Sequence, residues 1–87
     1  MALTREEARK RERSELVRYL TEVSVLGVRI PHGLAIEAAQ VFDTEPDASV
    51  DNVLWSVLRH MAGDPGTLRA KVKVRAARNG LDRVEVD

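Results

Sequence analysis

The chain has 87 residues, of which 44% are hydrophobic and 32% charged, and its 14 Lys and Arg balance 14 Asp and Glu. This length allows one domain with one core, and the composition excludes an intrinsically disordered chain. The absence of Cys excludes disulfides, a thiol nucleophile and a Cys-ligated zinc site. Only Tyr19, Phe42 and Trp55 are aromatic, so we expect a core of Val, Leu and Ala.

The N-terminal segment "TREEARKRERSE" lacks the apolar run of a signal peptide. No apolar run reaches the roughly 18 residues that a membrane-spanning helix needs. We therefore expect a cytoplasmic protein without a membrane partner.

The first expected helix begins at Thr4, where Thr4-x-x-Glu7 matches a capping box. Residues 1–13 are mostly charged, so this part of the helix is expected to project into solvent, and residues 14–87 form the domain. An apolar stripe at helical spacing follows, and Gly27 is a natural stop. The stripe consists of Leu16, Tyr19, Leu20, Val23 and Leu26.

The middle of the chain predicts a short strand and two helices. "VRI" at residues 28–30 alternates apolar and polar residues before Pro31, as a short strand does. Residues 33–42 predict a second helix with Leu34, Ala38, Val41 and Phe42 on one face. A loop-forming "DTEPDAS" precedes a third helix that Ser49 can cap. The third helix carries its apolar residues at helical spacing from residue 50 to 61 and ends near Gly63.

The last segment, residues 65–87, is compatible with a helix or with a β-hairpin. Pro65 near its start, followed by Ala70, Val74 and Ala77, fits a helix. The period-two alternation of Val72, Val74 and Ala76, followed by Asn79-Gly80, favours a hairpin.

A hairpin with a loop at residues 79–81 has a register in which opposite charges face each other. Arg78 lies opposite Asp82, Arg75 opposite Glu85, and Lys73 opposite Asp87. The other face is then apolar, because Val74 meets Val86 and Ala76 meets Val84. We therefore expect an α+β fold of three helices, a short strand and a C-terminal β-hairpin, with an all-α four-helix bundle as the alternative.

This order of elements over residues 14–87 resembles the winged-helix arrangement, a variant of the helix-turn-helix. The resemblance implies that residues 50–61 are equivalent to the recognition helix and that the hairpin is the wing. It also implies a DNA-binding regulatory or accessory protein whose recognition helix enters the major groove. Asn52, Ser56 and Arg59 would then face the groove, whereas Asp51 departs from this pattern because its carboxylate repels phosphate.

Residues 65–81 contain five cations and no acid. On a wing, these cations would neutralise phosphates of double-stranded DNA and make binding strongly dependent on salt. The alternative is that several of them pair with the acids across the hairpin. The five cations are Arg69, Lys71, Lys73, Arg75 and Arg78.

Trp55 lies at the edge of the third helix's apolar stripe, where it is expected to close the core. The alternative is an anchor for a homodimer or a protein partner, because Trp is enriched among the residues that dominate binding energy. An interface at Trp55, Leu58 and Tyr19 would make the chain a protein–protein adaptor or inhibitor.

Catalytic patterns are absent from the sequence. His32 and His60 have no matching Cys or carboxylate spacing for a metal site, and no phosphate-binding loop or nucleophile–base arrangement is present. We therefore expect neither enzymatic activity nor a cofactor, metal or small-molecule substrate.

Overall fold

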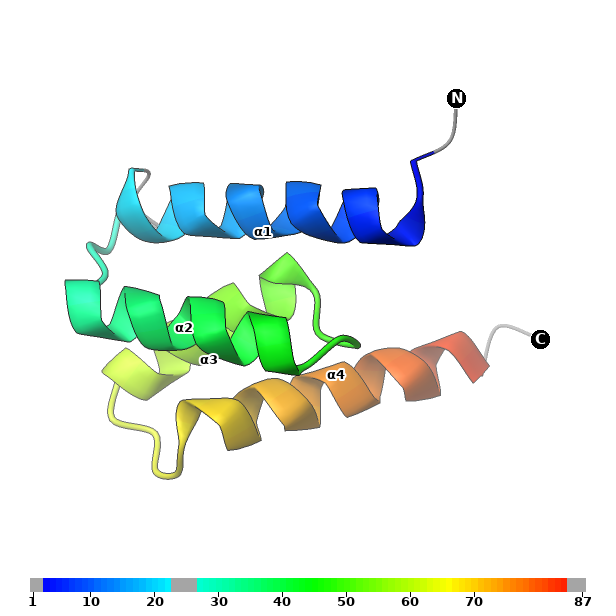
Figure 1. The fold of residues 1–87 in the computed structure, drawn as a ribbon. Helices are drawn as coiled ribbons and strands as arrows, with labels where there is room; N and C mark the ends of the chain where they lie inside the picture. Colours follow the sequence, from blue (N-terminus) through cyan, green and yellow to red (C-terminus); the bar gives the residue numbers. More distant parts are fainter. Residues whose placement is uncertain (1–2, 23–26, 85–87) are drawn as a thin grey trace.

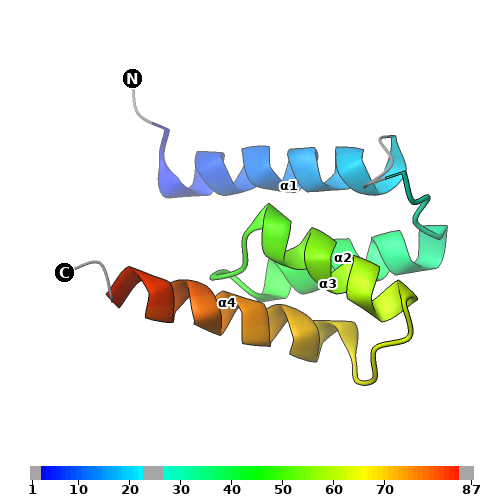
Figure 2. The ribbon, with the colours of Figure 1, turned by 180° about the vertical axis from the view of Figure 1, so that it is seen from behind.

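The computed structural model describes the backbone of residues 3–22 and 27–84 and the side chains of residues 3–22 and 27–78. Its helices are α1 (Arg5–Thr21), α2 (His32–Thr44), α3 (Val50–Met61) and α4 (Leu68–Val84). Helix α1 lies along one side and α4 along the opposite side, with α2 and α3 between them (Figure 1). Seen from behind, α3 lies in front of α2 (Figure 2). Helix α3 packs against all three other helices.

The N-terminus of α1 is capped as the sequence predicts. The Thr4 side chain accepts a hydrogen bond from the Glu7 backbone N–H at 3.1 Å, which satisfies one of the unpaired donors of the first turn. Leu16 and Leu20 are buried, whereas Tyr19 is partly exposed. The expected stripe continues at Val23 and Leu26, which lie outside the described residues.

The predictions of α2 and α3 are confirmed. Ala38, Val41 and Phe42 on α2 are buried, as their common face predicts. Ser49 and Asn52 form a reciprocal capping box at the start of α3, with bonds of 2.9 and 3.1 Å between each side chain and the other residue's backbone N–H. Gly63 follows α3 with a φ of 93°, a conformation that glycine adopts without the steric cost of a side chain.

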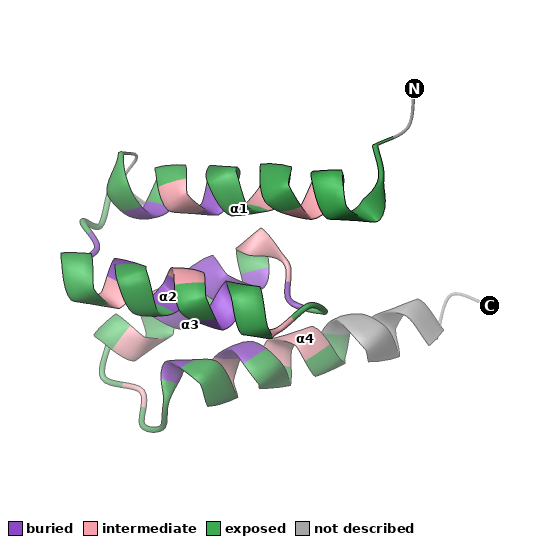
Figure 3. Cartoon of the chain, viewed as in Figure 1, coloured by how far each residue is buried: buried purple, intermediate pink, exposed green. Residues whose placement is uncertain are grey.

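The core lies where the four helices face one another (Figure 3). Phe42 is its largest fully buried side chain and is 0% exposed. The rest of the core is aliphatic, as the composition predicts. It consists of Leu16, Leu20, Ile30, Ala35, Ala38, Val41, Ala48, Val53, Leu54, Val57, Leu68 and Val72.

The expected C-terminal hairpin is wrong, because residues 68–84 form the single helix α4. The helix separates residues that the hairpin placed on one face: Val72 is 0% exposed, whereas Val74 is 62% exposed. Asn79-Gly80, the expected turn, lies within the helix. The pairings expected for Glu85, Val86 and Asp87 lie outside the described residues.

Tertiary packing explains why the helix prevails over the local hairpin signal. Helix α4 buries Leu68 and Val72 and packs Ala76 against the core, a row of residues at a spacing of four. Burying a Leu or Val side chain contributes roughly 1.5–3 kcal/mol, whereas a glycine inside a helix costs about 1 kcal/mol. Thr67 also favours the helix, since its side chain accepts a hydrogen bond from the Ala70 N–H at 3.2 Å.

The expected short strand at residues 28–30 is also wrong. Within the described parts of the chain, Val28 is a single bridge residue and no strand is present. Ile30 is nonetheless buried, and its side chain is part of the core between the helices. The described residues therefore have the all-α four-helix fold that the sequence offered as the alternative, and not the α+β fold.

Candidate functional site

Trp55 points away from the core, so the expectation that it closes the core is wrong. Its side chain is 50% exposed, although it lies on α3, the helix that packs against all three others. The buried residues of α3 include Val53, Ser56 and Val57. At about 100° per residue, Val53 and Val57 lie roughly 160° around the helix from Trp55, on its opposite side, and Ser56 lies about 100° away.

Two arginines lie near the exposed indole. The Arg75 guanidinium of α4 lies over the Trp55 ring, 5.4 Å from its centroid, within the range of a cation–π interaction. Arg59 is one turn after Trp55 on α3 and pairs with Asp64 at 3.5 Å. The Trp55 ring is therefore held at the surface where α3 meets α4.

A shallow hollow of about 220 Å³ lies between α3 and α4 in the same region. Four of the residues around it are cations and one is an acid. Its lining consists of Arg59, Asp64, Lys71, Val74, Arg75 and Arg78. Val74 is the most exposed of the large hydrophobic side chains in the described part of the chain. Together with Trp55, these residues form a basic surface with two exposed apolar side chains, which we call the Trp55 surface.

Asn52 and Ser56 do not belong to this surface. Both are buried, so the expectation that they face a DNA groove is wrong. The Asn52 side chain accepts the Ser49 N–H, and the Ser56 hydroxyl donates to the Asn52 carbonyl at 2.7 Å. Asn52, Ser56 and His60 follow one another at spacings of four residues. His60 Nδ1 lies 3.4 Å from Lys71 Nζ of α4. At His60, α4 therefore lies against α3.

The five cations of residues 65–81 lie along α4 and have different surroundings. Arg69 pairs with Glu45 at 3.1 Å, and Lys71 donates to the Gly66 carbonyl at 2.8 Å. Arg75 lies over Trp55. Lys73 and Arg78 are exposed, and neither forms an ion pair among the side chains that the structure describes.

Leu58 and Tyr19, the other two expected interface residues, lie on different helices. Leu58, on α3, is half-buried. Tyr19 is 37% exposed and lies in a depression lined by residues of α1 alone, namely Arg11, Ser14, Glu15 and Arg18. The structure therefore places Trp55 with α4 rather than with Tyr19.

Arg9 has a structural role that the sequence analysis missed. Its guanidinium donates hydrogen bonds to the carbonyls of Ala48, Phe42 and Glu45 at 2.6, 2.7 and 2.8 Å. It also stacks on the Phe42 ring, 3.5 Å from the centroid. These carbonyls lie at the C-terminal end of α2 and in the following loop, where a cation is favoured by the helix dipole. The alternating charges around Arg9 gave no signal that would distinguish it from its neighbours.

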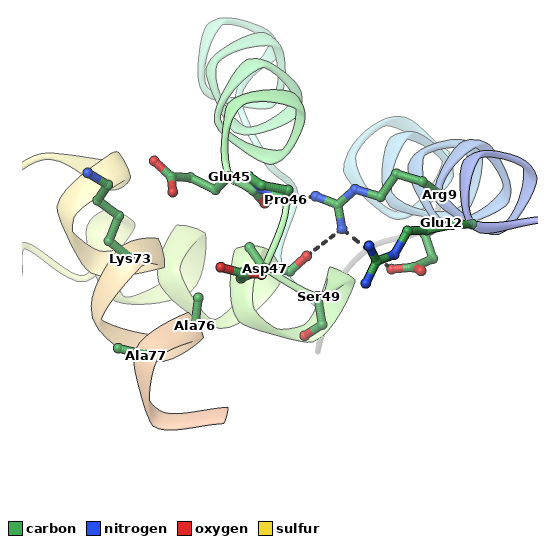
Figure 4. Close-up of a pocket in the computed structure, with 11 residues that line it drawn as sticks. Arg9, Glu12, Glu45, Pro46, Asp47, Ser49, Lys73, Ala76 and Ala77 are labelled. Atoms are coloured by element: carbon green, nitrogen blue, oxygen red, sulfur yellow. Dashed lines mark hydrogen bonds and ion pairs between the residues drawn. The ribbon is translucent and has the colours of Figure 1, made fainter. Parts of the chain in front are cut away.

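A groove of about 700 Å³ lies beside Arg9, between α1, the loop after α2, and α4 (Figure 4). Its cations Arg5, Arg9 and Lys73 are matched by the acids Glu12, Glu45 and Asp47. Figure 4 shows the Arg9 guanidinium directed toward the loop after α2, where it donates a hydrogen bond to the Ala48 carbonyl. The charges of the described residues that line the groove therefore balance, and Arg9 is already used in holding α1 to α2.

Comparison of the chain with models of protein families, with curated proteins and with solved structures finds no match. In the described residues, no helix is long and apolar enough to cross a membrane. Nor does any group of three or more His, Asp or Glu side chains in this part of the chain lie so that it could hold a metal ion.

Proposed function

We propose that the chain is a non-enzymatic protein–protein interaction module that binds an acidic partner through the Trp55 surface. The observation that carries this proposal is the position of Trp55. The only Trp of the chain is half exposed beside Arg75, while smaller side chains fill the core.

The chemistry of the Trp55 surface supports a protein partner. Trp and Arg are the residues most often found at the energetic centres of protein interfaces, where a ring enters a pocket and the surrounding groups exclude water. Arg75 restricts the indole from one side, so less side-chain entropy is lost when a partner covers the ring. Val74 adds an exposed apolar contact close to Arg75.

The charge of the surface indicates the kind of partner. Among the described side chains around the hollow, the four cations Arg59, Lys71, Arg75 and Arg78 outnumber the acid Asp64. A complementary acidic surface would be attracted to this region, and like-charged surfaces would be rejected. Binding is therefore selective for an acidic partner and weakens as salt rises.

A DNA-binding function receives less support from the same residues. Asn52 and Ser56, the two uncharged side chains expected to contact bases, are buried and bonded within the helix. Asp51, one turn before Trp55, is exposed and would repel phosphates and acidic side chains alike, so it does not distinguish the two kinds of partner. The cations of α4 could attract any polyanion, so duplex DNA is a necessary competitor in the test.

The proposal is tested by affinity isolation from the cells that make the protein, followed by titration of the purified candidate partner. Wild-type protein is compared with Trp55→Ala and Arg75→Glu. We expect Trp55→Ala to weaken binding by roughly 30-fold or more, as loss of an interface anchor does. Arg75→Glu reverses a charge next to the ring and should weaken the same complex.

Tyr19→Ala is the matched control, because it also removes a partly exposed aromatic ring, but on α1. The proposal predicts that this variant binds the partner as wild type does. It is overturned if Trp55→Ala binds with unchanged affinity, or if duplex DNA binds more tightly than any protein does and its binding is insensitive to Trp55→Ala.

A further inference from the structure

The outward side of α4 carries a narrow apolar stripe with cations on both sides of it. Ala70, Val74 and Ala77 are exposed and follow one another at spacings of four and three residues. Leu68 and Val72, on the opposite side of the same helix, are 0% exposed and anchor it to the core. The outward stripe is therefore a second apolar side of α4, distinct from the one that the fold uses.

The spacing of this stripe is that of a coiled-coil seam. With Ala70 and Ala77 at position d and Val74 at position a, the flanking positions e and g hold Lys71, Arg78 and Lys73. All three of these side chains are cations, and the next g position is Gly80. In a pair of helices, residues at e and g face those of the partner helix and select it by charge. Small residues at d also allow a partner helix to approach closely.

We propose that an acidic amphipathic helix of a partner protein lies along α4, with its apolar residues on the Ala70–Val74–Ala77 stripe. This inference rests on the proposed function and specifies the form of the partner. Its Glu or Asp residues meet Lys71 and Arg78 on one side and Lys73 on the other. The row formed by Lys71 and Arg78 also borders the hollow next to Trp55, so the partner's adjoining surface can cover the indole.

A second copy of α4 does not fit this stripe. Two such helices side by side would bring Lys71, Lys73 and Arg78 against cations of the other copy, and like charges at an interface are strongly unfavourable. A lipid bilayer fits poorly as well. Interfacial helices insert Trp, Phe or Leu side chains, whereas Val74 is the only large apolar side chain in the described part of the stripe.

The probe is a synthetic, fluorescently labelled peptide of about three heptads with Leu at a and d and Glu at e and g. A control peptide carries Lys at e and g. Anisotropy titrations against the full chain at low salt should show binding of the Glu peptide only. Combining Lys73→Glu with Arg78→Glu should weaken binding roughly tenfold or more, because repulsion replaces attraction on both sides of the stripe.

Combining Lys10→Glu with Arg11→Glu is the matched control, because it makes the same change in net charge at exposed positions of α1. This variant should bind the Glu peptide as wild type does. Val74→Gln keeps every charge and should weaken binding several-fold, because it removes the central apolar contact of the stripe. Circular dichroism of each variant checks that the helices are retained.

The inference is overturned if the Glu peptide fails to bind, if the Lys peptide binds equally well, or if Val74→Gln has no effect. If Val74→Gln has no effect, the cations of α4 attract any polyanion, including duplex DNA, by charge alone and without packing of a partner helix. These failures are distinguishable from failure of the proposed function. A partner whose binding requires Trp55 could still be isolated from cells when the peptide does not bind.

Discussion

The Arg75 guanidinium lies 5.4 Å from the centroid of the Trp55 ring and joins α4 to α3 at the protein surface. This contact holds the only Trp of the chain outside the core, with half of its side chain exposed. An exposed cation–π pair contributes about 0.5–1 kcal/mol. Folding therefore gains little stability from the exposed half of the Trp55 side chain. That half remains available to a partner.

Trp55→Ala should destabilise the fold by only about 1–2 kcal/mol, because half of the ring is already in contact with water. Phe42→Ala should cost about 3–5 kcal/mol, since that ring is fully buried. Urea unfolding followed by circular dichroism measures both free energies. If the two variants lost equal free energies of unfolding, Trp55 would be a core residue and could not serve as an anchor for a partner.

Arg9→Ala should destabilise the fold by about 2–3 kcal/mol. The substitution removes a charged donor from three carbonyls and a cation from the Phe42 ring. Arg9→Lys should recover only part of this stability, because an ammonium cannot reproduce the planar fork of the guanidinium. The measurement is again the free energy of unfolding in urea.

Arg11→Ala provides the control for Arg9, since Arg11 is exposed on the same helix. Its effect should stay within about 0.5 kcal/mol, as is usual for surface substitutions. If Arg9→Ala had an equally small effect, the three hydrogen bonds would contribute nothing to holding α1 against the C-terminal end of α2.

Gly80→Ala distinguishes the helix from the hairpin by the sign of its effect. In the interior of α4, alanine should stabilise the fold by roughly 0.5–1 kcal/mol, because glycine is the poorer helix former. In an Asn-Gly hairpin turn, glycine has a positive φ and alanine would be destabilising. Thermal unfolding of the variant gives the sign directly, and a lower melting temperature would contradict the helix.

Much of the fold could be predicted from the sequence where local signals agree with packing. Thr4 and Ser49 cap their helices as expected, and the apolar face of residues 33–42 is buried as expected. The last segment could not be predicted in this way. Its period-two pattern and its Asn79-Gly80 pair favour a hairpin locally, whereas burial of Leu68 and Val72 against other helices favours the helix.

The candidate site was predicted only in part, and the error in the last segment explains the rest. Trp55 and the cations of α4 were singled out by composition and charge. In the all-helical fold, α4 packs against α3, and Asn52 and Ser56 are buried instead of facing a groove. The same change turns Val74 outward, from an expected apolar sheet face to the exposed stripe.

Site-specific photocrosslinking in the cells that make the protein can show whether a protein partner covers Trp55. One variant carries a photoreactive side chain at Ala62, the exposed residue that follows the end of α3, about two turns after Trp55. A second carries it at Ile36, an exposed apolar residue on the outward side of α2. We expect a discrete protein adduct at position 62 that disappears when Trp55→Ala is added, and no such adduct at position 36. Equal adducts at both positions, or an adduct at position 62 that persists without Trp55, would contradict the proposed function.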